Sequence, residues 1–119
     1  MNEEQLKIRL VTALLSRADL KKIAAERFGD MVKAVVDVKR GTMAIGGELH
    51  ADEEAYLLER DSQQEDIWGI NLYPDEIGEG FIEYDSMINI RPSRGNRSRD
   101  IVDKGIREKI RDIVDRLIG

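Results

Sequence analysis

Hydrophobic residues follow a helical spacing in two segments of the chain, residues 16–28 and 103–118. In each segment the apolar side chains recur every three or four residues, which predicts a helix with one buried stripe. Ser16 and Asp103 stand where a side-chain oxygen can accept from the free N–H groups of the first turn. We therefore expect two amphipathic helices, the second of them at the C-terminal end of the chain.

Between these helices, apolar and polar residues alternate, which is typical of strands because successive side chains point to opposite faces. We expect strands at residues 31–39, 42–47, 67–73 and 81–90. The short run Lys39-Arg40-Gly41 predicts a tight turn that makes a hairpin of the first two. The last strand should be broken or bulged near Asp85 and Ser86.

The order of apolar and polar residues does not decide between helix and strand in two segments. Residues 1–15 alternate Leu6, Ile8 and Leu10 with polar residues, which favours an edge strand or an N-terminal extension, although residues 11–15 would also extend a helix. Residues 51–60 fit a short helix as well as a strand, and the pattern does not separate the two.

These elements predict an α+β fold in a single domain, residues 1–119. We expect a two-layer sandwich, with the helices at 16–28 and 103–118 packed on one face of a mostly antiparallel sheet. The covered face would carry Val36, Trp68, Ile70, Ile88 and Ile90. The opposite face would be polar and solvated, with Gly46 and Gly69 leaving room for a shallow site.

The amino-acid composition argues against several classes of function. The 119 residues include no cysteine, which excludes disulfides and thiolate chemistry. No apolar run has membrane-spanning length and no signal-peptide pattern opens the chain, so we expect a cytoplasmic protein without a membrane partner. The net charge of −5 argues against nucleic acid as a general partner.

The first candidate site is the arginine-rich loop at residues 91–99. Its ligand-binding candidates are Arg91, Arg94, Asn96, Arg97 and Arg99. Guanidinium groups match carboxylate and phosphate oxygens, and a loop rich in Gly, Ser and Asn presents free N–H groups to an anion. The leading hypothesis is a small binding domain for a phosphorylated or other anionic ligand, with a short RNA kept as an alternative at this loop. In the competing interpretation the arginines pair with the chain's own carboxylates.

The second candidate site is the trio Glu48, His50 and Asp52, which is chemically competent for acid–base work or for a metal ion. Asp37 is a further possible member. The chain has one histidine and no metalloprotease signature, so oxygen ligands would favour Mg²⁺ or Mn²⁺ over zinc. This alternative predicts a metal-dependent, hydrolase-like activity.

The third hypothesis is a protein-interaction module or a homodimer. Residues 48–85 carry thirteen acidic side chains and one arginine, Arg60, whereas residues 91–111 have a net charge of 8 − 3 = +5. Such asymmetry would let the acidic segment of one copy meet the basic loop of another.

Several runs of the sequence resemble a small uncharacterised family of prokaryotic proteins, a domain of unknown function. They are ERFGDMVKAVVD (26–37), AIGGELHADEEA (44–55), QEDIWGINLYP (64–74), SMINIRP (86–92) and GNRS (95–98). The resemblance extends over residues 16–118. It implies a complete family member but no activity, ligand or catalytic residue.

Overall fold

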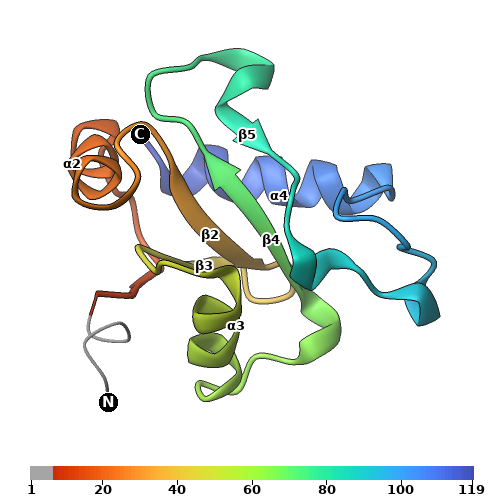
Figure 1. The fold of residues 1–119 in the computed structure, drawn as a ribbon. Helices are drawn as coiled ribbons and strands as arrows, with labels where there is room; N and C mark the ends of the chain where they lie inside the picture. The colour runs from red at the N-terminus through yellow and green to blue at the C-terminus, as the bar shows by residue number, and fades with distance from the viewer. Residues whose placement is uncertain (1–6) are drawn as a thin grey trace.

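The computed structural model describes residues 7–119 and has an α+β fold built on a five-stranded antiparallel sheet (Figure 1). The strands lie in the order β1-β3-β2-β4-β5. Their bounds are Arg9–Val11 for β1, Val32–Asp37 for β2, Thr42–Ile45 for β3, Ile67–Leu72 for β4 and Ile82–Glu83 for β5. The expected hairpin of β2 and β3 is confirmed.

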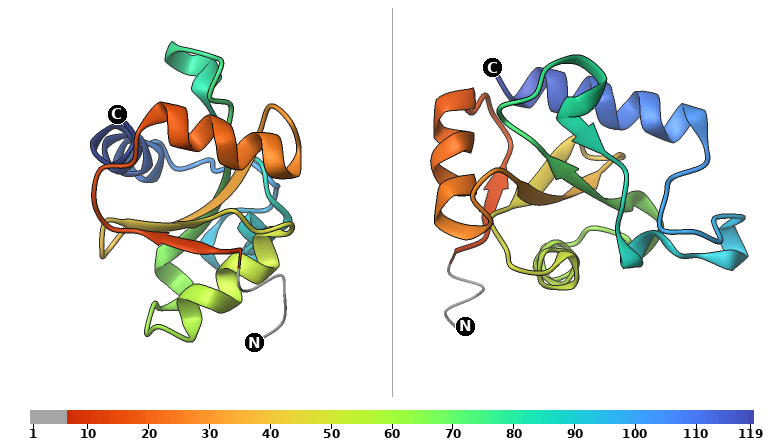
Figure 2. Two further views of the ribbon diagram at one scale, coloured as in Figure 1. Left: turned by 90° about the vertical axis from the view of Figure 1, so that its left-hand side faces the viewer. Right: turned by 45° about the horizontal axis from the view of Figure 1, so that its top comes forward.

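Two helices cover one face of the sheet, as the sequence predicts. They are α2 (Arg17–Arg27) and α4 (Lys104–Leu117), which Figure 2 shows on the same side of the strands. The caps are also as expected: Ser16 Oγ accepts from the Asp19 N–H, and Asp103 Oδ1 accepts from the N–H groups of Gly105 and Ile106. No helix among residues 7–119 is long and apolar enough to cross a membrane.

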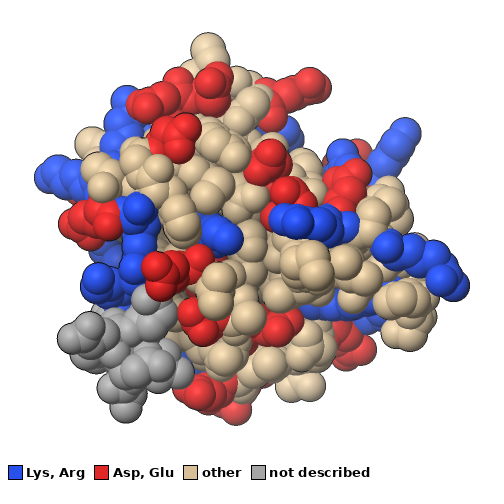
Figure 3. All heavy atoms as spheres, in the orientation of Figure 1, with Lys and Arg blue, Asp and Glu red and all other residues tan. Residues whose placement is uncertain are grey.

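A projecting loop, residues 73–81, joins β4 to β5 at the top of Figure 1. Figure 3 shows Asp and Glu side chains gathered at this end of the molecule. The loop closes through two backbone bonds, from the Tyr73 N–H to the Phe81 carbonyl and from the Glu76 N–H to the Tyr73 carbonyl, each at 2.9 Å.

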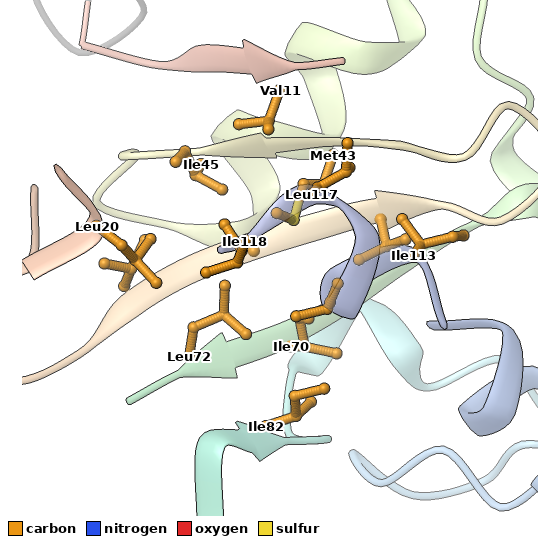
Figure 4. Packing of buried hydrophobic residues seen from close by; sticks show 14 of the residues in the cluster. Val11, Leu20, Met43, Ile45, Ile70, Leu72, Ile82, Ile113, Leu117 and Ile118 are labelled. Atoms are coloured by element: carbon orange, nitrogen blue, oxygen red, sulfur yellow. The ribbon is translucent and has the colours of Figure 1, made fainter. Parts of the chain in front are cut away.

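The main core lies between the sheet and helices α2 and α4. Figure 4 shows its side chains pointing toward one another from both layers, among them Leu20, Met43, Ile70 and Leu117. Trp68 belongs to this cluster and is buried with Ile70 and Leu72, as the alternation in β4 predicts. Burial of so many large apolar side chains supplies most of the driving force for folding.

The opposite face of the sheet is covered in part by a third helix, α3 (His50–Leu58). A second cluster joins the helix to the strands and contains Ile8, Val35, Ala44, Leu57 and Ile67. The segment 51–60 is thus largely helical, and the expectation that this face is solvated throughout is wrong. The small side chain of Ala44 in β3 belongs to this cluster together with Leu57 of α3.

The strand expected at residues 81–90 is for the most part not formed. Only the two residues of β5 form a strand, and the chain then forms two 3₁₀ turns, η3 (Met87–Asn89) and η4 (Pro92–Arg94). Ser86 Oγ accepts from the Ile88 N–H and starts the first turn. Ile88 therefore packs against the second cluster and Ile90 is exposed, instead of both lying under α2 and α4.

The N-terminal strand is present but short, since β1 has three residues and pairs with β3. Leu6 lies outside the described residues. Residues 11–15 do not extend a helix: Leu15 instead forms a parallel bridge with Ile118, next to the end of α4.

Candidate anion-binding cleft

A cleft of about 630 Å³ lies between the loop that follows β5 and the segment that leads into β4. Its wall is made by residues of α3, of the two segments and of η4, and its lining is Glu54, Gln63, Gln64, Glu65, Met87, Ile88, Ile90, Arg91, Ser93 and Arg94. It combines an apolar side with four charged side chains, two of each sign. We refer to it below as the cleft.

Side chains of residues 89–96 fix the wall of the cleft against the sheet. The Asn89 amide spans Gly69 of β4: its Oδ1 accepts from the Gly69 N–H at 2.8 Å and its Nδ2 donates to the Gly69 carbonyl at 2.9 Å. Arg91 and Asn96 pair through both backbone groups, and Gly95 takes the left-handed conformation (φ 77°) that closes the turn. The wall is therefore held by side-chain hydrogen bonds to β4 and by one antiparallel bridge within the loop.

Arg91 sits at the base of the cleft. Its side chain is 10% exposed. Nη2 donates to the Ile67 carbonyl at 2.6 Å, and the guanidinium carbon lies 4.7 Å from the centre of the Trp68 ring. Nη1 is buried with no hydrogen-bond partner. The nearest carboxylate oxygen is Glu54 Oε2, 3.9 Å from Nη2 and so beyond hydrogen-bond distance.

This position leaves the charge of Arg91 incompletely compensated. Burial lowers the pKa of the guanidinium, whereas the carboxylate of Glu54 raises it and the positive charge of Arg94 lowers it further. A buried cation is stable only when it is paired and its donors are used. Additional negative charge in the cleft would therefore be favourable.

Arg94 stands at the rim, with its side chain 44% exposed. Its Nη1 lies 3.8 Å from Glu65 Oε2, which is also beyond hydrogen-bond distance. Two arginines outside the cleft have closer partners: Arg99 Nε lies 2.7 Å from Asp85 Oδ1, and Arg107 Nη2 lies 2.6 Å from Asp100 Oδ1, whereas the pairs of Arg40 and Arg60 are as loose as those of the cleft. Both cleft arginines thus keep donor capacity that Arg99 and Arg107 use.

The structure does not gather the five loop candidates at one point. Arg91 and Arg94 line the cleft. Arg99 is engaged by Asp85 in two contacts, and Arg97 is exposed and outside the cleft lining. Asn96 is buried, and its Nδ2 donates to the carbonyls of three residues, Asn89, Ser98 and Asp100. Its observed contacts hold the loop together.

The alternative trio lies at the start of α3. Glu48 is exposed and Asp52 half-buried, whereas His50 is buried with Nε2 at 2.8 Å from the Ile70 carbonyl. A carbonyl only accepts, so this nitrogen carries the proton. Burial, with smaller contributions from Lys33 and Arg99, lowers the pKa of the imidazole below its usual 6.5.

The described part of the chain contains no group of three His, Cys, Asp or Glu side chains that could hold a metal ion. Asp37, the further candidate, is buried and its oxygens accept from the N–H groups of Lys39 and Arg40 and from the Ser62 hydroxyl. The metal-dependent alternative gains no support from this geometry.

The room expected beside two glycines of the sheet is filled by the protein itself. A Cβ on Gly69 would lie 2.5 Å from Ser86 Cβ, and a Cβ on Gly46 would lie 2.7 Å from the Lys7 carbonyl oxygen. The shallow polar site predicted at these positions is therefore absent. Gly69 serves instead for the close approach of the η3 turn.

Several cleft residues were not among the candidates from the sequence, notably Glu54, Gln63, Gln64 and Met87. They come from three separate segments, and no spacing in the sequence links them. The one available signal is the proximity of Met87 and Ile90 to Arg91 along the chain, which places apolar and cationic side chains on one loop.

The architecture defines a class of protein: a small α+β domain with a five-stranded antiparallel sheet and helices on both faces. Within that class the chain belongs to the family described as "Protein of unknown function (DUF5674)", whose sequence model matches residues 9–117. No curated protein and no solved structure was found to match the chain.

Proposed function

We propose that this domain binds a ligand with an anionic group, a phosphate or a carboxylate, in the cleft between η4 and the segment before β4. Arg91 at the base and Arg94 at the rim would receive the anion. The apolar side chains Met87 and Ile90 would contact the remainder of the ligand.

Arg91 carries the proposal, because it lines the cleft and its buried Nη1 has no hydrogen-bond partner. The two cleft arginines lie 3.9 and 3.8 Å from their nearest carboxylates, whereas Arg99 and Arg107 outside the cleft form pairs of 2.7 and 2.6 Å. Charge-assisted hydrogen bonds to an incoming anion would use donors that the fold leaves free. Glu54 and Glu65 would compete with the ligand, which favours an anion able to bind two guanidinium donors at once.

The first test is titration of the labelled protein with phenyl phosphate, which has an apolar part and an anion, followed by amide NMR. We expect saturable shifts at Met87, Ile90 and Ser93. Arg94→Ala should weaken binding about tenfold, because one hydrogen bond to a charged group contributes about 1.5 kcal/mol. Arg94 is preferred to Arg91 because Arg91 also holds β4 through the Ile67 carbonyl.

Arg97→Ala is the matched control, since it removes an exposed arginine of the same loop that does not line the cleft. Phenyl phosphate affinity should be unchanged in this variant. An equal loss in both variants would indicate a diffuse charge effect, and no saturable shift in the wild-type protein would refute the cleft as an anion site. Phenol, which lacks the anion, should bind more weakly than phenyl phosphate.

The cytoplasm is the compartment we propose, which the absence of cysteine in the chain supports. A short RNA is the less favoured ligand. The cleft lining contains no aromatic ring on which a base could stack. Raising the salt concentration should therefore weaken phenyl phosphate binding modestly, without the steep dependence of a protein that neutralises many phosphates.

A further inference from the structure

An isoleucine stands in solvent at the tip of the projecting loop. Ile77 is 84% exposed, the highest value among the large exposed apolar residues of the described chain. Its neighbours are the acidic residues Asp75, Glu76 and Glu79. An exposed aliphatic side chain set among carboxylates offers a partner both an apolar contact and negative charge.

The loop is held in shape before any partner arrives. Arg17 Nη1 donates to the carbonyls of Pro74 and Glu76, each at 3.1 Å, and its guanidinium carbon lies 4.1 Å from the centre of the Phe81 ring. Lys21 adds a salt bridge to Asp75 at 3.3 Å. A segment fixed in this way loses little conformational entropy when it binds.

The cleft offers complementary chemistry. Met87 is 65% and Ile90 is 38% exposed, so an aliphatic side chain can be buried between them. Arg94 at the rim can receive a carboxylate, and Gln63 and Gln64 also line the cleft, where their side-chain carbonyls can accept from a peptide N–H. These features suit an acidic peptide segment with an aliphatic residue.

We propose that the acidic loop of one copy docks in the cleft of a second copy, with Ile77 against Met87 and Ile90 and a loop carboxylate on Arg94. The inference rests on the proposed function, because it names the source of the anion. Glu65 must yield Arg94 to the incoming carboxylate, and Glu54 opposes it, so the contact is weak and sensitive to salt. Loop and cleft are different surfaces, which makes the contact head-to-tail and leaves each pair with one free loop and one free cleft.

Head-to-tail geometry allows a complementation test with the full chain in analytical ultracentrifugation at low ionic strength. Ile77→Asp removes the loop contact and Met87→Asp removes the cleft contact, and both residues are exposed, so both variants should fold. The wild-type protein should associate increasingly with concentration, and each variant alone should stay monomeric. An equimolar mixture should form heterodimers that grow no further, because Ile77→Asp keeps its cleft and Met87→Asp keeps its loop.

Val102→Asp is the control, since it places the same charge at an exposed apolar residue outside the loop and the cleft lining. This variant should associate like the wild-type chain. A wild-type chain that stays monomeric at its highest soluble concentration would overturn the proposal, as would association that neither Ile77→Asp nor Met87→Asp reduces. Phenyl phosphate binding without self-association would leave the anion site standing and overturn only this inference. Heterodimers without phenyl phosphate binding would support the docking of the loop and refute the cleft as a site for a free small anion.

Discussion

At the scale of single residues, Asn89 explains why β5 can be so short. Its amide bonds to both backbone groups of Gly69 in the way that a neighbouring strand would. Arg91 does the same for the Ile67 carbonyl with its guanidinium. The open edge of β4 is thus satisfied by side chains, and the chain is free to turn away and form the cleft wall.

Gly69 provides a direct test of this arrangement. We expect Gly69→Ala to lower the free energy of unfolding by about 1–3 kcal/mol, because an added Cβ forces a rearrangement of packed neighbours. It would lie 2.5 Å from Ser86 Cβ and 3.1 Å from Ile88 Cγ1. Urea denaturation measures the change.

The matched control for Gly69 is Gly80→Ala. A Cβ there would meet Glu76 at 3.5 Å, an ordinary contact. Its stability should stay within about 0.5 kcal/mol of the wild-type value, as is usual for a surface substitution. If Gly69→Ala were equally mild, the η3 turn would not be packed against β4 as described.

Candidate residues from the sequence line the cleft only where one loop supplies them. Arg91 and Arg94 are candidates because arginines among turn formers favour an anion, but Arg97 and Arg99 share this pattern and lie outside the cleft lining. Glu54 and Gln64 join the two cleft arginines only through the docking of α3, where Gln64 Nε2 donates to Glu54 Oε2 at 2.7 Å. Such pairing across segments has no trace in local spacing.

At the scale of elements, the loop from residue 86 to residue 102 depends on Asn96 more than on any regular structure. Three carbonyls accept from its Nδ2, and its Oδ1 accepts from the Val102 N–H at 3.0 Å. The sequence suggests a ligand-binding role for Asn96 because the same donors that bind anions also bind backbone.

Replacing this residue should loosen the whole loop. We expect Asn96→Ala to cost about 3 kcal/mol, since it leaves buried carbonyls and one N–H without partners. Hydrogen exchange at the Val102 amide should accelerate, and chemical denaturation should give the loss of stability. Ser93→Ala, an exposed change in the same loop, should alter neither; unchanged exchange in Asn96→Ala would show that the loop is held by other contacts.

Helices α2 and α4 could be predicted because their caps and apolar stripes are local features. The same local patterns failed at residues 86–90, where a run of apolar residues resembles a strand. Ser86 and Asn89 decide that segment, by bonding to Ile88 and Gly69 respectively. Side-chain-to-backbone bonds of this kind compete with strand pairing and are invisible to an analysis of periodicity.

At the scale of the whole molecule, the three layers place a histidine inside the protein. His50 lies between α3 and the sheet, buried, with its ring bonded to the Ile70 carbonyl. Its position explains why the polar run 48–52, which suggests chemistry in the sequence, contributes here to packing. It also makes the stability of the fold dependent on pH.

Burial lowers the pKa of His50 in the folded state below the 6.5 of an exposed imidazole. The unfolded chain therefore takes up a proton at a pH where the folded chain does not. The contribution of this group to stability is complete above pH 6.5 and decreases as the pH falls from there toward the lowered pKa. We expect less stability at about pH 5.5 than at about pH 7.5, with the His50→Gln variant showing a smaller difference.

Because His50 is the only histidine in the chain, its imidazole signals in NMR can be assigned without ambiguity. The titration should give a pKa below 6.5 in the folded protein, and urea denaturation at the two pH values should give the matching loss of stability. A titration at or above 6.5 would mean that the ring is hydrated. The second layer formed by α3 would then open readily in solution, and with it the wall of the cleft that carries Glu54.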